Sequence, residues 1–318
     1  MNKLLFVFIL ISHCCFGQSE SKQNFTIAIH IPDNNRNSVA ALQKFVTEHN
    51  IQQIRCYEDK KLVAMLRFDT KGNALEEMDT YANSVSRINS EYDALNRCTR
   101  VAFHHANGDF NYGYKYTYDG PYKTEFKIGD SIPKKRTIEL KDENITIYSN
   151  YTDTKEREIN SIIFQNDDAS YSRELRYTDG KVYLEFKYFY NPKKQEGGTK
   201  VIHYDYNGTK ISEEDRSAYK TDKNGNRIER YSAYATDTLQ LISTHKFNEK
   251  NQVLEHKYPS QLQNFEYNEN GQIVKKTIDD RNGITVLNFY YKDSLPEKIV
   301  KRNGDKKLTF SYEYEYFK

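Results

Sequence analysis

Aromatic and aliphatic residues alternate with polar residues along three long stretches of the chain. In the last of them, Phe310, Tyr312 and Tyr314 fall on one side, while Glu313 and Glu315 fall on the other. A period of two residues is typical of a β-strand that buries one face and leaves the other in water. The pattern predicts strands over residues 112–118, 182–190 and 308–316.

Helical spacing is convincing in one stretch. Ser38 is a good N-cap residue, and Val39, Leu42, Phe45 and Val46 follow it on one helical face. Elsewhere, Asn-Gly, Asp-Gly and Gly-Gly pairs separate short apolar runs, as hairpin turns require. We therefore expect one short helix near residues 38–49 in a chain of strands and tight turns.

A short motif recurs: an aromatic residue, Asp or Asn, two further residues, and then Gly or Asn. It reads "FDTKG", "YDALN", "YDYNG", "FNEKN" and "YNENG", and "TDKNG" is a copy that lacks the aromatic residue. Several neighbouring copies lie about 20–26 residues apart, which suits a unit of two strands and two turns. A tyrosine-rich meander could also produce such copies by chance, but the conserved spacing from aromatic residue to turn favours a true repeat.

The predicted fold class is all-β: a repetitive antiparallel β-meander, forming an open, rolled or solenoid-like sheet, with one short N-terminal helix. No stretch has the composition of a linker. Residues 18–318 are therefore expected to form a single continuous β-repeat domain.

One copy of the motif carries a resemblance to a known family. Residues 92–101, "YDALNRCTRV", resemble the YD-repeat unit of bacterial Rhs-type proteins, and "YNENGQIVKK" and "YDYNGTKISEE" are looser copies. Asn96 stands where that family usually has Gly, and the chain is far shorter than an Rhs shell. A looser similarity is to MORN-like repeats. Both resemblances imply a repetitive β-surface rather than an enzyme, and the toxin-encapsulating role of Rhs proteins is not expected here.

Residues 1–17 have the order of a secretory signal peptide. Lys3 precedes the apolar run "LLFVFILI", and small residues lead to Gly17, so cleavage is expected before Gln18. A lipoprotein would instead carry its lipid on Cys14 or Cys15, but the residue before either one is not the usual small residue. We expect an exported protein, periplasmic, on the cell surface or secreted, without a transmembrane segment.

Composition narrows the class of partner. The chain has 27 tyrosines, no tryptophan and a formal net charge of +2. A balanced charge argues against nucleic acid as a partner, because nucleic-acid binding requires a clustered basic face. Exposed tyrosines favour binding of a glycan or a protein at the cell envelope, although the lack of tryptophan weakens the glycan alternative.

No motif for a cofactor, a metal or a catalytic centre is found. Adjacent histidines on a strand point to opposite faces, so they cannot easily bind one metal together. The acidic runs lack the ligand spacing of a calcium loop. We predict no cofactor, no metal site and no catalytic residue. The residues considered and set aside are His104, His105, Asp279, Asp280, Glu213, Glu214 and Asp215.

Cys56 and Cys98 are the cysteines left after removal of the signal peptide. In an exported protein they can pair, and closing a loop of about 42 residues would stabilise the fold by roughly 4 kcal/mol. Each cysteine lies in a different repeat-like unit, so nothing in the sequence sets them opposite one another. Both alternatives, a disulfide and two free thiols, remain open from the sequence.

Two functional classes remain. The first is a non-catalytic exported β-repeat protein, structural or binding a ligand or partner at the cell envelope. The second is an exported hydrolase, for example one active on glycosides, whose catalytic carboxylates are dispersed in sequence and meet only in the fold. The repeats and the tyrosine content favour the first.

Overall fold

The computed structural model describes residues 5–8, 28–31, 38–80, 86–105, 107–131, 133–140, 143–151, 157–167, 170–233 and 238–318. The chain forms two compact units. Unit 1 comprises Met1–Tyr112 and Phe247–Lys318, and unit 2 comprises Gly113–Lys246. Both boundaries fall inside strands, β8 (Phe110–Asp119) and β18 (Gln240–Phe247).

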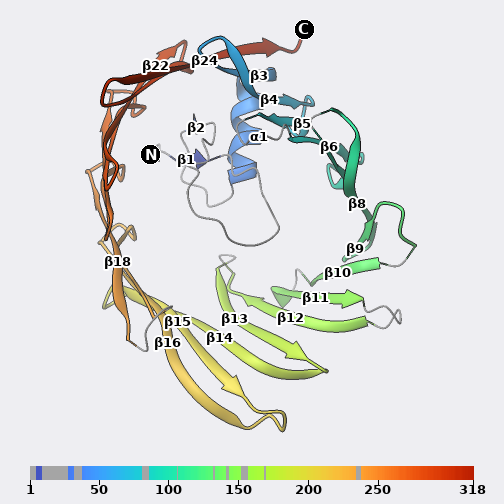
Figure 1. Ribbon diagram of the computed structural model, residues 1–318. Helices are drawn as coiled ribbons and strands as arrows, with labels where there is room; N and C mark the ends of the chain where they lie inside the picture. The colour runs from blue at the N-terminus through green and yellow to red at the C-terminus, as the bar shows by residue number, and fades with distance from the viewer. Residues whose placement is uncertain are drawn as a thin grey trace. The chain divides into compact units, whose positions relative to one another are not determined.

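Unit 1 contains the helix and the strands from both ends of the chain (Figure 1). Its elements are β1 (Leu5–Phe8), β2 (Ala28–Ile31), α1 (Ser38–Glu48), β3 (Ile51–Glu58), β4 (Lys61–Phe68), β5 (Ala74–Asp79), β6 (Ser86–Tyr92), β7 (Cys98–His104), β19 (Val253–Tyr258), β20 (Gln261–Tyr267), β21 (Ile273–Asp280), β22 (Gly283–Lys292), β23 (Leu295–Asn303) and β24 (Lys306–Tyr316).

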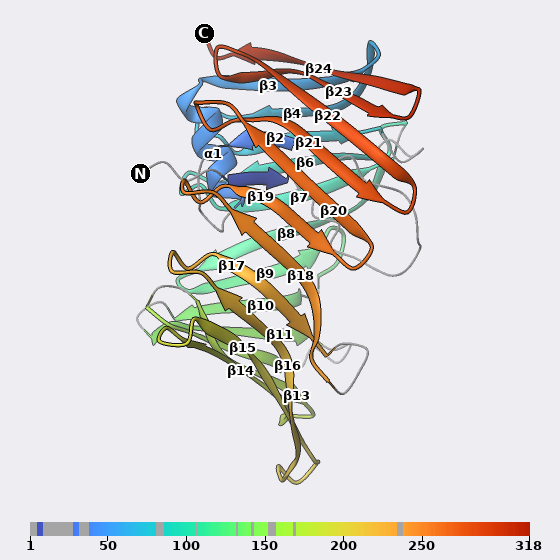
Figure 2. The same cartoon turned by 90° about the vertical axis from the view of Figure 1, so that its left-hand side faces the viewer.

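Unit 2 is a continuous antiparallel meander, whose strands run side by side in Figure 2. Its strands are β9 (Tyr122–Lys127), β10 (Pro133–Leu140), β11 (Ile145–Tyr151), β12 (Arg157–Gln165), β13 (Tyr171–Thr178), β14 (Lys181–Asn191), β15 (Glu196–Tyr204), β16 (Lys210–Thr221) and β17 (Arg227–Ser232).

The first and last strands of the main sheet are paired with each other. In unit 1, β24 lies antiparallel to β3, with Tyr312 opposite Cys56 and Tyr314 opposite Ile54. Every other neighbour in the strand order is consecutive in sequence, so β3 to β24 form a closed antiparallel barrel of 22 strands in the described residues. The expectation of an open, rolled or solenoid-like sheet is therefore wrong. Closure leaves no exposed strand edge, a feature that local patterns do not reveal.

Strands β1 and β2 form a separate two-stranded sheet, in which Leu5 lies opposite Ile31. Most of the predicted signal peptide lies outside the described residues, and its cleavage remains a prediction.

Helix α1 covers one face of the unit 1 sheet. Phe45 and Val46 are 3% and 1% exposed and join a cluster that includes Ile54 and Leu66 of the sheet. The closing strand β24 contributes Phe310 to the same cluster. The apolar face of α1 that the sequence predicts therefore covers the sheet where its first and last strands meet (Figure 1).

All six copies of the recurring motif fold into the same turn. In the copy at Asn268, the main-chain N–H of Gly271 donates to the carbonyl of Asn268 over 2.9 Å, and Gly271 has φ of +80°. The Asn268 side-chain oxygen accepts the N–H of Gln272 over 2.9 Å. The corresponding acceptor side chains in the other copies are Asp69, Asp93, Asp205, Asp222 and Asn248.

The residue after the turn links neighbouring turns in three copies of the motif in unit 1. Gln252 donates from its side chain to the carbonyl of Gly271 over 3.2 Å, and Gln272 donates to the carbonyl of Ser294 over 3.0 Å. The side chain of Asn73 takes the same position in its own turn and bonds to that of Asn96 in the next one. The polar residues of the motif therefore hold the sheet together along its turn-bearing edge.

A tyrosine hydroxyl closes the open end of four hairpins in unit 1. In each case it donates to the main-chain carbonyl at or near the start of the preceding strand, over 2.7–3.3 Å. Such a bond satisfies a carbonyl at the strand end while the ring covers the sheet. The pairs are Tyr92 to Ala74, Tyr267 to Val253, Tyr291 to Ile273 and Tyr314 to Pro296.

Candidate functional site

The candidate site lies on strands β14 to β17 of unit 2, where few apolar side chains are buried. Tyr190, Gly197 and Tyr219 are direct cross-strand neighbours on β14, β15 and β16. A Cβ atom at Gly197 would overlap the ring of Tyr219, so this ring lies over the glycine. A side chain at that position would displace the ring, and the sequence "EGG" therefore allows two tyrosines to approach across the middle strand.

The two rings are held in a defined orientation. Their centroids lie 6.2 Å apart and their planes differ by 10°. The Tyr190 hydroxyl is 3.0 Å from Oγ1 of Thr221, and Tyr190 still exposes 48% of its surface. The Arg227 guanidinium carbon lies 4.2 Å from the centroid of Tyr219, a cation–π geometry. We call Tyr190, Gly197 and Tyr219 the tyrosine row.

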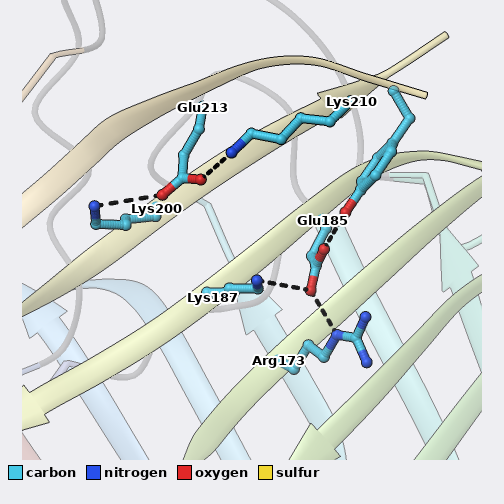
Figure 3. A network of polar contacts seen from close by, with 7 residues as sticks. Arg173, Glu185, Lys187, Lys200, Lys210 and Glu213 are labelled. Carbon is cyan, nitrogen blue, oxygen red and sulfur yellow. Dashed lines mark hydrogen bonds and ion pairs between the residues drawn. The ribbon is translucent and has the colours of Figure 1, made fainter. Parts of the chain in front are cut away.

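The opposite face of the same strands carries a buried carboxylate (Figure 3). Glu185 of β14 is 2% exposed, and its Oε1 lies 2.7 Å from Nε of Arg173 and 3.7 Å from Nζ of Lys187. The Tyr204 hydroxyl donates to Oε2. A buried carboxylate is tolerated only when it is paired in this way. The three partners come from β13, β14 and β15, so Glu185 ties these strands together.

Burial by itself would raise the pKa of Glu185, but the hydrogen bonds from Tyr204 and Arg173 outweigh burial. The pKa of Glu185 is therefore lowered, and the group is a carboxylate at neutral pH rather than a proton donor. Beside this network, Glu213 is paired with Lys200 over 3.4 Å and also with Lys210 (Figure 3).

Charged side chains lie on both faces of the unit 2 sheet. Behind Glu185, Glu174 accepts from Arg176 over 2.7 Å and from the Tyr188 hydroxyl over 3.2 Å. Arg176 also covers the ring of Phe186, 4.6 Å from its centroid. Burial and the Glu174 carboxylate raise the pKa of Tyr188 to about 12. Both faces of this sheet are therefore suited to contact with water.

The structure does not bring the histidines and acids considered in the sequence into one site. Nδ1 of His104 lies 3.2 Å from the carbonyl of Gly108, and Asp280 accepts the N–H of Asn282 over 2.7 Å. Glu214 lies 3.4 Å from His203 in unit 2, and Asp279 and Asp280 belong to unit 1. No group of three metal-binding side chains occurs in the described part of the chain.

Cys56 and Cys98 are free thiols in this structure. Cys56 is buried on β3 and Cys98 is half-buried on β7, with three strands between them. Strands are spaced about 4.8 Å apart, so this separation is far beyond the reach of a disulfide. Burial raises the pKa of the Cys56 thiol to about 12, which makes it unreactive at neutral pH.

Sequence reasoning missed the groups with the most unusual surroundings. Glu77 lies between Leu66 and Ile88 on neighbouring strands, and burial raises its pKa. Lys276 lies between Phe265 and Leu287, and burial lowers its pKa to about 8. In the sequence each follows a residue of the same charge, Glu76 or Lys275, and only the cross-strand neighbours show which of the two is buried.

Family models give no match to the chain, and no curated protein matches it. Among solved structures, TcdB2-TccC3 matches with 10% identity and a TM-score of 0.29, covering 88% of this chain and 21% of that one. A porin-like protein from Bacteroides uniformis matches with 9% identity and a TM-score of 0.22, covering 83% and 98%. A Bacteroides fragilis protein of unknown function matches with 15% identity and a TM-score of 0.14, covering 54% and 91%.

TcdB2-TccC3-Cdc42 also matches, and this chain spans only 19% of the length of the matched chain. Likenesses at these TM-scores support no conclusion about the function of this chain.

In the described residues, no helix is long and apolar enough to cross a membrane.

Proposed function

We propose that the chain is an exported, non-catalytic β-repeat protein of the YD-repeat type that binds a ligand or partner at the cell envelope. The supporting observation is how the polar residues of the repeat are used. In all six copies, the Asp or Asn side chain accepts hydrogen bonds within its own turn. These residues build the scaffold, and the residues between the turns are left to vary.

Exposed tyrosines occupy some of those positions. Tyr190 and Tyr171 expose 48% and 50% of their surface on unit 2. Tyrosine supplies contact area together with a polar hydroxyl and is favoured at binding surfaces. The lowered pKa of Glu185 also disfavours a general acid at this buried carboxylate.

Two measurements test this proposal. Fractionation of the native host followed by N-terminal sequencing should find the protein outside the cytoplasm and starting at Gln18; retention of residues 1–17 would contradict export. A combined glycan and peptide array should give a ligand whose binding falls when exposed tyrosines are replaced by Ala. Turnover of an arrayed glycan that disappears when one carboxylate is replaced would instead support the exported hydrolase.

A further inference from the structure

The tyrosine row has an unusual electrostatic setting. Arg230 is the direct cross-strand neighbour of Tyr219, and Arg227 lies over the ring of Tyr219. Lys193 and Lys194 lie in the loop between β14 and β15, beside Tyr190 in sequence. Ion pairs within 4 Å are absent for these four cations in the described part of the chain, whereas Arg173, Lys200 and Lys220 of the same unit are paired with carboxylates.

Two acidic residues near the row, Asp222 and Glu229, are already engaged. The Asp222 side chain accepts N–H groups within its own turn over 2.8 and 2.9 Å. Glu229 accepts from the Tyr231 hydroxyl and lies 2.9 Å from Lys220. These bonds lower the pKa of Glu229, so its carboxylate is charged and already bonded to Tyr231 and Lys220. Glu196, the exposed acid next to Gly197, points to the other face of the sheet, because consecutive strand residues alternate. On the face of the tyrosine row, these three carboxylates therefore do not balance the positive charge.

We propose that the tyrosine row is a binding site for a carboxylated polysaccharide, a glycan chain built from hexuronate residues. This inference rests on the proposed function and names its ligand class. The C–H face of a pyranose ring can stack on the exposed ring of Tyr190, and a guanidinium matches the planar geometry of a carboxylate. The hydrogen bond to Thr221 holds the Tyr190 ring, and the Tyr219 ring packs over Gly197. Both side chains are therefore already ordered, and little side-chain entropy is lost on binding.

The arginines select among glycans by charge. A neutral polysaccharide would gain the stacking contact but would leave Arg227 and Arg230 without a carboxylate partner. A polyanion without pyranose rings would gain the charge contact but would lack the sugar face. The site therefore favours a ligand that has both features.

The experiment measures binding of the purified full chain to polygalacturonate, alginate and hyaluronan by calorimetry. Dextran serves as a neutral polysaccharide, and a single-stranded DNA oligonucleotide serves as a polyanion without pyranose rings. We expect at least one carboxylated polysaccharide to bind about tenfold or more tightly than dextran and DNA, and to weaken between about 50 and 300 mM NaCl.

Matched variants locate the site. Tyr190→Ala should weaken binding about tenfold, whereas Tyr190→Phe, which keeps the ring, should stay within about threefold of the original affinity. Arg227→Gln and Arg230→Gln should each weaken binding about tenfold and reduce its salt dependence. Tyr183→Ala, an exposed tyrosine near the other end of β14, and Arg281→Gln in unit 1 should change affinity less than about twofold. Circular dichroism confirms that each variant is folded.

The outcomes separate the two proposals. Failure of all three carboxylated polysaccharides to bind, equal binding of DNA, or unchanged affinity in Tyr190→Ala overturns the site. If an arrayed peptide or neutral glycan binds through other tyrosines, the ligand class is wrong while the proposed function stands. If the chain instead hydrolyses a glycan through a single carboxylate, both proposals fail.

Discussion

The hydroxyl of Tyr291 donates a 2.8 Å hydrogen bond to the main-chain carbonyl of Ile273 and so closes the open end of the β21–β22 hairpin. Burial raises the pKa of Tyr291, which keeps the hydroxyl protonated and able to donate. The same arrangement in three other hairpins makes this bond a recurring element of unit 1 rather than a local accident.

Replacing Tyr291 by Phe keeps the ring but removes this bond. We expect the free energy of unfolding to fall by about 1–2 kcal/mol, since a buried carbonyl loses its partner. Urea denaturation measures the change. Tyr290→Phe on the same strand is the control, because Tyr290 is 45% exposed, and should cost less than about 0.5 kcal/mol. Equal effects of the two variants would show that the hydroxyl bond contributes nothing.

The second prediction concerns the recurring turn. Asn268→Ala removes the acceptor of the Gln272 N–H and the side-chain bond to Gln272, which is 3.0 Å long. We expect a loss of about 1–2 kcal/mol, typical of a lost side-chain cap of a turn. Thermal unfolding gives the difference. Glu269→Ala in the same turn is exposed and should be neutral; if both variants unfold alike, the motif does not owe its recurrence to this bond.

The turns and the helix could be predicted from the sequence, whereas the closure of the barrel could not. The spacing of aromatic residue, Asx and Gly identified all six turns, because the requirement for φ above zero and for a side-chain acceptor is local. The helix over residues 38–48 was equally visible, since its apolar spacing is local too. Closure of the barrel was not visible. Tyr312 is paired with Cys56, which lies near the other end of the chain. The local sequence of a strand does not show which distant strand it pairs with.

The candidate site was hidden for the same reason. Glu185 follows the alternation expected of a solvated strand face, and only its cross-strand neighbours make it a buried, triply bonded carboxylate. The tyrosine row likewise depends on the register that places Gly197 between Tyr190 and Tyr219. A one-residue slip in that register would move each side chain to the other face.

The third prediction concerns Glu185. Glu185→Gln keeps the size of the side chain but removes the charge that faces Arg173 and Lys187. We expect the variant to be less stable at pH 7 by about 1.5–3 kcal/mol, toward the lower end because Arg173 is half exposed. Chemical denaturation at a series of pH values measures the difference. Glu213→Gln, an exposed ion pair beside it, is the control and should leave the denaturation midpoint unchanged.

The pH dependence of this difference has a definite sign. The pKa of Glu185 is lowered from its usual 4.5 in the fold, so the unfolded state binds more protons below pH 4.5. The stability from Glu185 is therefore complete above pH 4.5 and is lost as the pH falls through the lower folded value. The two proteins should converge in acid, and a gap that stayed constant with pH would show that the charge is irrelevant.

The last prediction concerns Lys276, which stands between Phe265 and Leu287 in unit 1, with its Nζ 5.2 Å from the centroid of the Phe265 ring. Burial lowers its pKa from 10.5 to about 8. The folded chain therefore releases this proton near pH 8, while the unfolded chain keeps it until about pH 10.5. Between these values the unfolded state binds more protons, so the contribution of Lys276 to stability rises with pH.

Lys276→Met should remove this dependence. At pH 7 the variant should be more stable than the original protein by up to about 3 kcal/mol, because no charge is buried. The gap should shrink as the pH rises from about 8 to about 10, the range below ionisation of tyrosines in the unfolded chain. Lys275→Met is the control, since Lys275 points to the opposite face and pairs with Glu266 over 2.7 Å; its pH profile should match that of the original protein. If the difference in stability between Lys276→Met and the original protein did not change with pH, the pKa of Lys276 would be the same in the folded and unfolded chain.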